Sequence, residues 1–198
     1  YIFLDNETPE VRRQTIQRFS TDPALVKPLY QMAFDITKLL EKHHIKYWAI
    51  FGTLMGAVRQ VDEGGKFKGG LMPWDDDFDF GIQTADAPKI NQSPFIDELH
   101  DLGYAIADDD LVGWHVYQIQ KVFLPTQNKE VQTFLDLFFM HQKNDQWVLS
   151  QPKGRQFFPK CIFLNSQVET LVRYPFGGFE IWGPTQPELF LKRHSVPS

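Results

Sequence analysis

Four aspartates fall within residues 75–79 and, apart from Asp76, alternate with apolar and aromatic residues. Asp75, Asp77 and Asp79 share one side of an extended strand there, and the other side carries Phe78, Phe80 and Ile82. Residues two apart on a strand are separated by about 6.5–7 Å, so carboxylates at this spacing can converge on one or two divalent cations. Like charges in a half-buried strand are costly unless a cation neutralises them. The pattern therefore predicts a metal-facing strand; the alternative is a solvated acidic strand end.

A second strand, expected over residues 133–140, is strongly apolar and holds a single carboxylate, Asp136. An isolated buried charge needs a partner, a cation or a place at the strand's end. Asp136 is therefore the best candidate for a third metal-facing carboxylate. The alternative is an aspartate that accepts backbone hydrogen bonds at a strand terminus.

Periodicity and capping signals predict the elements around these two strands. Apolar residues in steps of four and three predict a helix from Asp22 to about His43, and Thr8-Pro9 marks an earlier helix start. Further helices are expected over 54–59, 88–102 and 189–194, and further strands over 46–51, 104–107 and 114–123, with turns at 108–110 and 177–178. Because no repeat or low-complexity stretch interrupts the chain, we expect one domain over 1–198. Its parts are N-terminal helices (1–45), a core (46–140) and a C-terminal aromatic hairpin region with a short helix (141–198).

The strand expected over 46–51 ends in Gly52-Thr53 and leads into a helix. A helix start presents backbone N–H groups that suit a phosphate, although most Gly-Thr pairs of this kind are ordinary caps. The following residues, 60–70, form a loop rich in Gly and Lys, including Lys66 and Lys68. This loop is expected to be either a mobile lid beside the acidic strand or a plain surface loop.

Composition narrows the function classes. The net charge of −5 argues against a nucleic-acid partner, and a single cysteine, Cys161, excludes an internal disulfide. No apolar run is long enough for a transmembrane segment, and no signal peptide is visible. These features favour a cytoplasmic place for this segment, but the chain opens at Tyr1, so targeting regions can lie outside it and the compartment stays open.

Three pieces of the chain, taken in order, resemble the LicD family, which also includes the fukutin-related proteins. They are residues 51–59 (Phe-Gly-Thr-Leu-Met-Gly-Ala-Val-Arg), 73–81 (Pro-Trp-Asp-Asp-Asp-Phe-Asp-Phe-Gly) and 135–138 (Leu-Asp-Leu-Phe). The first two together are highly specific, and the resemblance covers about Trp48 to Arg193. The link over residues 60–72 is longer than family members usually have.

The resemblance implies an α/β (α+β) chain of the nucleotidyltransferase type, with a small mixed sheet flanked by helices. It implies that Asp77, Asp79 and Asp136 are the catalytic, metal-binding carboxylates and that Asp75 supports them. Gly52 and Thr53 would then hold the phosphates of the donor. Other expected donor-binding residues are Arg59 and Trp74, which lie in matched motifs, and Lys121, which lies outside them.

LicD-like enzymes transfer a phosphorylated alcohol, such as phosphocholine or phosphoribitol, from a CDP-linked donor to a sugar hydroxyl. The resemblance therefore implies a metal-dependent phosphotransferase that uses Mg²⁺, with Mn²⁺ as the alternative ion, and a carbohydrate acceptor. Two other functions stay open. One is a nucleotidyltransferase that places NMP on a sugar, a protein or a small molecule; the other is a catalytically silent nucleotide-binding module.

Overall fold

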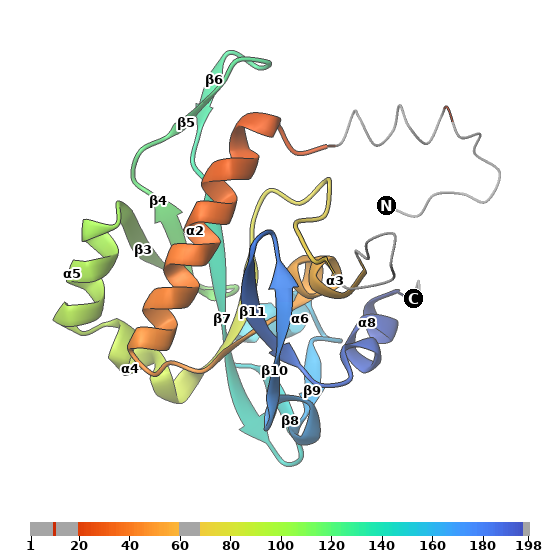
Figure 1. The fold of residues 1–198 in the computed structure, drawn as a ribbon. Helices are drawn as coiled ribbons and strands as arrows, with labels where there is room; N and C mark the ends of the chain where they lie inside the picture. Colours follow the sequence, from red (N-terminus) through yellow and green to blue (C-terminus); the bar gives the residue numbers. More distant parts are fainter. Residues whose placement is uncertain (1–9, 11–19, 60–67, 196–198) are drawn as a thin grey trace.

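A mixed sheet forms the centre of the computed structural model (Figure 1), which describes residue 10, residues 20–59 and residues 68–195. Its main strands lie in the order β1 (Tyr47–Ala49), β2 (Asp79–Gln83), β7 (Phe134–Lys143), β4 (Gly113–Gln118) and β3 (Tyr104–Asp109). Strands β2 and β7 run parallel, whereas the other neighbours in this order are antiparallel. Strands β8 (Gln146–Leu149) and β9 (Ile162–Leu164) extend the sheet from the far end of β7. The expected mixed sheet flanked by helices is confirmed. The helix start expected at Thr8 and the loop lysine Lys66 lie outside the described residues.

Helix α2 (Pro23–Lys42) covers one face of the sheet (Figure 1) and matches the helix expected over 22–43. Asp22 caps it, because its side chain accepts a hydrogen bond from the Ala24 N–H at 3.0 Å. The ring of Tyr30 meets the ring of Phe78 edge-on, with centroids 6.2 Å apart. The predicted apolar stripe is buried as expected: Leu25, Leu29, Met32, Ile36 and Leu39.

The opposite face of the sheet packs against helix α3 (Phe51–Arg59) and the segment that follows α6 (Pro152–Phe157). Phe51 contacts Phe138 of β7 and Phe158, with ring centroids 5.2 and 4.9 Å apart. The expectation that Gly52-Thr53 ends a strand is wrong, because α3 already begins at Phe51. Strand β1 stops at Ala49, and the Leu54 N–H donates to the Ile50 carbonyl at 2.9 Å, which closes the first turn.

Several other boundaries differ from the expected ones. The acidic strand begins at Asp79 rather than Asp75. The helix expected over 88–102 is split into α4 (Ala87–Ile90) and α5 (Ser93–Asp101), because Pro94 favours a new helix start. The strand expected over 114–123 ends at Gln118, and β5 (Val122–Leu124) pairs with β6 (Lys129–Val131) in a separate hairpin.

The C-terminal part follows the sequence pattern more closely. Strands β10 (Leu171–Phe176) and β11 (Phe179–Pro184) form the predicted hairpin, and Gly177 and Gly178 between them have positive φ angles of 56° and 100°. Helix α8 (Pro187–Ser195) follows, while η1 (Thr84–Asp86) and α7 (Asn165–Val168) are short connections elsewhere. The hairpin expected around 108–110 is present, but its turn lies at 110–112, because β3 runs on through Asp109 and pairs there with Gly113 of β4.

Helix α3 packs closely against the loop that leads into the acidic residues. The Gly70 N–H donates to the Gly56 carbonyl at 3.2 Å. A Cβ atom added to Gly56 would lie 2.1 Å from the Gly70 carbonyl oxygen, far inside contact distance. Gly56 therefore sets how near the loop can approach the helix.

We predict that Gly56→Ala lowers the free energy of unfolding by about 1–3 kcal/mol, because the added methyl group pushes α3 and the loop apart. Urea denaturation of the wild type and the variant measures the change. Alanine is the better helix former by up to about 1 kcal/mol. An unchanged or increased stability would therefore show that the close contact does not constrain the fold.

Candidate active site

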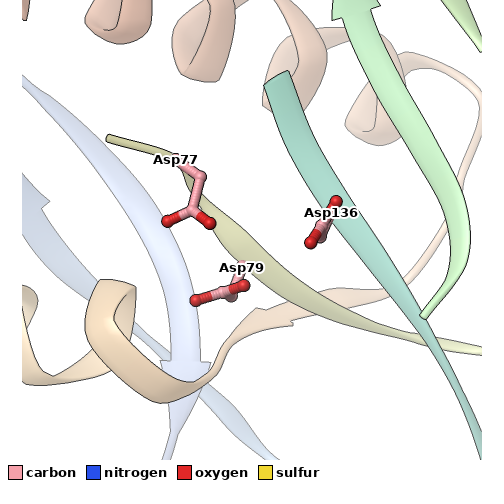
Figure 2. Close-up of side chains that lie close together, drawn as sticks. All are labelled: Asp77, Asp79 and Asp136. Atoms are coloured by element: carbon pink, nitrogen blue, oxygen red, sulfur yellow. The ribbon is translucent and has the colours of Figure 1, made fainter. Parts of the chain in front are cut away.

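Three carboxylates, Asp77, Asp79 and Asp136, face one another where β2 lies beside β7 (Figure 2). One oxygen atom from each lies within 4.8 Å of the other two. The parallel register pairs Asp79 with Asp136, and the Asp136 N–H donates to the Phe78 carbonyl at 2.7 Å. Asp77 lies two residues before Asp79, just ahead of the strand, on the same side. The structure thus brings together the three carboxylates that the sequence singled out.

Helix α3 and the residue before it hold the backbone of Asp79 at both of its polar groups. The Asp79 N–H donates to Thr53 Oγ1 at 2.8 Å, and the Ile50 N–H donates to the Asp79 carbonyl at 3.2 Å. Thr53 is buried, with 2% of its surface exposed. Its hydroxyl therefore anchors β2 to the first turn of α3 and fixes the position from which the Asp79 carboxylate projects.

Asp75 approaches the same helix start from the loop. A Cβ atom on Gly52 would lie 2.5 Å from Asp75 Oδ2, so only glycine leaves room for this carboxylate. The Thr21 hydroxyl donates to the Asp75 carbonyl at 2.5 Å and holds the loop in this place. A carboxylate is favourable beside the first turn of a helix, as a phosphate would be. A donor phosphate at Gly52 would therefore have Asp75 as its neighbour.

None of the remaining residues expected at the site belongs to the carboxylate cluster. Arg59 ends α3 and Lys121 precedes β5; both side chains are exposed. Among the described residues, neither makes an ion pair with the three carboxylates. Trp74 is 41% exposed and lines a cavity together with Asp76. Asp76, which stands on the opposite parity of the acidic run, is exposed and outside the cluster.

The electrostatics of the cluster follow from burial and like charge. Burial, followed by the charges of Asp136, Asp76 and Asp75, raises the pKa of Asp77 to about 7. Burial and then Asp77 raise the pKa of Asp79 well above its ordinary range. The pKa of Asp75 is raised to about 6, mainly by burial and then by Asp76. A divalent cation would replace the retained protons, and an all-carboxylate set suits a hard ion such as Mg²⁺ or Mn²⁺.

His115 completes the site, although the sequence gave no sign of it. Its Nδ1 lies 2.7 Å from Asp136 Oδ1, within hydrogen-bond distance. Its ring stacks on Phe134, with centroids 4.5 Å apart. The hydrogen bond to Asp136 raises the pKa of the His115 imidazole. The contact arises because β4 and β7 pair His115 with Asp136, a register that no local pattern encodes.

The fold and the carboxylate cluster define an α+β domain of the nucleotidyltransferase type. Residues 44–186, well over half of the chain, match the LicD/FKTN/FKRP nucleotidyltransferase domain. The chain therefore belongs to this family, and the matched range includes all three carboxylates. The resemblance seen in the three sequence motifs is confirmed.

Two relatives and one solved structure illustrate the similarity. The chain is 31% identical over 159 residues to the uncharacterized protein RP689 of Rickettsia prowazekii (strain Madrid E), covering 80% of this chain and 50% of the relative. It is 23% identical over 172 residues to the ribitol 5-phosphate transferase FKRP of Homo sapiens, covering 87% of this chain and 32% of the relative. The crystal structure of ANT(2")-Ia in complex with adenylyl-2"-tobramycin aligns at 10% identity with a TM-score of 0.45, covering 84% of this chain and 76% of that one.

The chain is shorter than these sequence relatives, since it spans half of the rickettsial protein and 32% of FKRP. Within the part of the chain that the structure describes, no helix is long and apolar enough to cross a membrane.

The raised pKa of Asp77 predicts how its contribution to stability changes with pH. In the metal-free folded protein Asp77 keeps its proton up to about pH 7, but the unfolded chain releases it near pH 4. The folded state binds more protons between these values, so this contribution to the free energy of unfolding falls as the pH rises through them. In EDTA, the free energy of unfolding of Asp77→Asn minus that of the wild type should therefore increase as the pH rises from 5 to 8. The expected increase is on the order of 1 kcal/mol.

Chemical denaturation of both proteins at the two pH values measures this difference. Comparing the variant with the wild type cancels the titration of groups outside the cluster. A difference in stability that stays constant with pH would mean that Asp77 ionises normally in the folded protein.

Proposed function

We propose that this chain is the catalytic domain of a metal-dependent transferase that moves a phosphorylated alcohol from a CDP-linked donor to a glycan hydroxyl. The transferred group would be phosphocholine-like or phosphoribitol-like. The observation that carries the proposal is the convergence of Asp77, Asp79 and Asp136 within 4.8 Å on a nucleotidyltransferase-type sheet. Membership of the LicD/FKTN/FKRP family and the similarity to a ribitol 5-phosphate transferase support it.

The carboxylate cluster fits a divalent ion by its chemistry and by its charge. Asp77, Asp79 and Asp136 offer oxygen ligands alone, and the raised pKa values of Asp77 and Asp79 reflect crowded negative charge that a cation would neutralise. When bound, Mg²⁺, or Mn²⁺ as the alternative, supplies positive charge for the diphosphate of the donor and for the charge that develops during transfer.

The reaction itself would be a displacement at phosphorus. The acceptor hydroxyl oxygen forms a bond to the phosphorus that carries the alcohol, the bond from that phosphorus to the bridging oxygen breaks, and CMP leaves. Asp136 would accept the proton of the acceptor hydroxyl, while His115 holds one oxygen of its carboxylate in place. Little covalent chemistry is asked of the protein, because positioning and charge neutralisation lower most of the barrier.

The donor would lie along the first turn of α3. Gly52 and Thr53 would adjoin its phosphates, with the Asp75 carboxylate shaping the pocket beside them. Arg59 and Lys121 are exposed cations that could add positive charge for an anionic donor.

A nucleotidyltransferase that places NMP on a sugar, a protein or a small molecule is the second candidate, since the family is described as a nucleotidyltransferase domain. The leaving group separates the two functions. Release of CMP from a CDP-linked alcohol supports transfer of the alcohol phosphate, whereas release of pyrophosphate from CTP supports nucleotidyl transfer. A catalytically silent nucleotide-binding module would release neither.

We predict that Asp77→Asn abolishes CMP release from the true donor while the fold stays intact, because the variant removes one of three converging carboxylates. CDP-choline and CDP-ribitol with Mg²⁺ are the donors to assay, with circular dichroism as the check on folding. Asp110→Asn is the matched control, since Asp110 lies on an exposed turn and pairs with Lys153. Full turnover by Asp77→Asn would rule out the proposed role of the cluster.

We also predict that His115→Ala weakens Mn²⁺ binding by about 10–100-fold, because Asp136 loses the hydrogen bond that orients its carboxylate. Isothermal titration calorimetry with Mn²⁺ measures the affinity. His141→Ala is the control, because His141 lies on β7 five residues beyond Asp136 and its ring contacts Ser150 instead of Asp136. Equal affinity in both variants would mean that His115 does not support the metal ligand.

A further inference from the structure

A cavity of about 340 Å³ lies between the start of α2, the acidic loop, the β5–β6 hairpin and the first residue of β7. Two of its lining residues connect it to the cluster. Asp76 is next to Asp77 in the chain, and Phe134 precedes Asp136 by two residues on β7, a separation of about 6.5–7 Å along the strand. The Phe134 ring also stacks on His115, which bonds Asp136, so the cavity borders the residues that surround the carboxylates.

The walls of the cavity belong to three separate segments that hydrogen bonds join. The Thr21 N–H donates to the Pro73 carbonyl at 2.7 Å, and the Thr21 hydroxyl donates to the Asp75 carbonyl. On the other side, the Thr126 hydroxyl donates to the Asp22 carboxylate, which links the start of α2 to the β5–β6 hairpin. The cavity is therefore built into the fold and is framed by the same loop that carries the acidic residues.

The chemistry of the lining suits an uncharged polyhydroxyl compound. Trp74 leaves 41% of its surface exposed at the cavity and offers an apolar face for the C–H groups of a sugar ring. Gln127 and Gln132 carry amides that both donate and accept hydrogen bonds, as sugar hydroxyls require.

The charges of the lining argue against binding of the nucleotide-linked donor in this cavity. The carboxylates of Asp22 and Asp76 outnumber the one described cation in the lining, Lys129. This balance repels the phosphates of a nucleotide and leaves a neutral ligand unaffected.

We propose that this cavity holds a sugar ring of the acceptor and that Trp74 is the surface against which it packs. The inference rests on the proposed function, because it names the binding place of the acceptor in that reaction. It places Trp74 with the acceptor instead of the donor, where the sequence resemblance had placed it. Donor and acceptor would then meet at the carboxylates from two sides, the first turn of α3 and this cavity.

Titration of the full chain by ligand-observed NMR tests the proposal. The probes are methyl glycosides of galactose, N-acetylgalactosamine and rhamnose, with CMP as the nucleotide probe. We expect at least one glycoside to bind, and Trp74→Ala to weaken that binding about tenfold through loss of the aromatic face. Gln127 is a second, exposed residue of the lining, and Gln127→Ala should weaken binding of the same glycoside. Leu102→Ala, an exposed apolar truncation at the end of α5 and outside the cavity, should bind it as the wild type does.

Two results would overturn the proposal. One is glycoside binding that is absent or unaffected by both cavity variants; the other is CMP binding that falls in Trp74→Ala, which would make the cavity a nucleotide site. Assays of CMP release separate this inference from the proposed function. CMP release without Trp74-dependent glycoside binding would refute the acceptor site alone. Trp74-dependent glycoside binding without CMP release from either donor would refute the proposed reaction and leave a sugar-binding cavity.

Discussion

Mutual repulsion among three carboxylates is the constraint on which the rest of this structure depends. The parallel pair of β2 and β7 sets Asp79 directly beside Asp136, and the loop before β2 adds Asp77. The pKa values of Asp77 and Asp79 are raised because burial and like charge oppose the ionisation of these two groups. Crowded carboxylates of this kind destabilise the folded state, but they suit a divalent cation. The cluster is therefore best understood as a functional site.

Burial of apolar side chains offsets the repulsion among the carboxylates, because β2 and β7 are apolar on one face and acidic on the other. The face toward α2 is apolar, and burial of each large side chain there stabilises the fold by roughly 1.5–3 kcal/mol. The residues concerned are fully buried: Phe78, Phe80, Leu135 and Leu137. The other face carries the acidic residues, and the Thr53 hydroxyl of α3 and the N–H of the preceding Ile50 bind the backbone of Asp79 there. Packing on one face thus maintains charge crowding on the other.

The site has two distinct sides. On one side, the start of α3 brings backbone and the Asp75 carboxylate together at Gly52, a suitable place for phosphates next to a bound cation. On the other side, Trp74 and amide side chains line a cavity of neutral to acidic character. Because phosphoryl transfer depends chiefly on positioning, separate places for donor and acceptor, as proposed, would keep the two substrates apart until they meet at the carboxylates.

Local patterns in the sequence were enough for the features that depend on local periodicity. Spacing predicted the apolar stripe of α2, the two glycines of the β10–β11 hairpin and the convergence of Asp77 and Asp79. Asp136 was recognisable as a lone charge in an apolar strand. The family motifs added the fold type.

Tertiary structure alone decided where β2 begins, why α3 starts at Phe51, and which partners surround the carboxylates. The contacts of Thr21 and Gly52 with Asp75 hold the acidic loop out of the strand, and the pairing of β4 with β7 places His115 on Asp136. These contacts join segments far apart in the chain. Periodicity tells which face a side chain occupies, but strand register and loop packing are fixed only when distant segments meet.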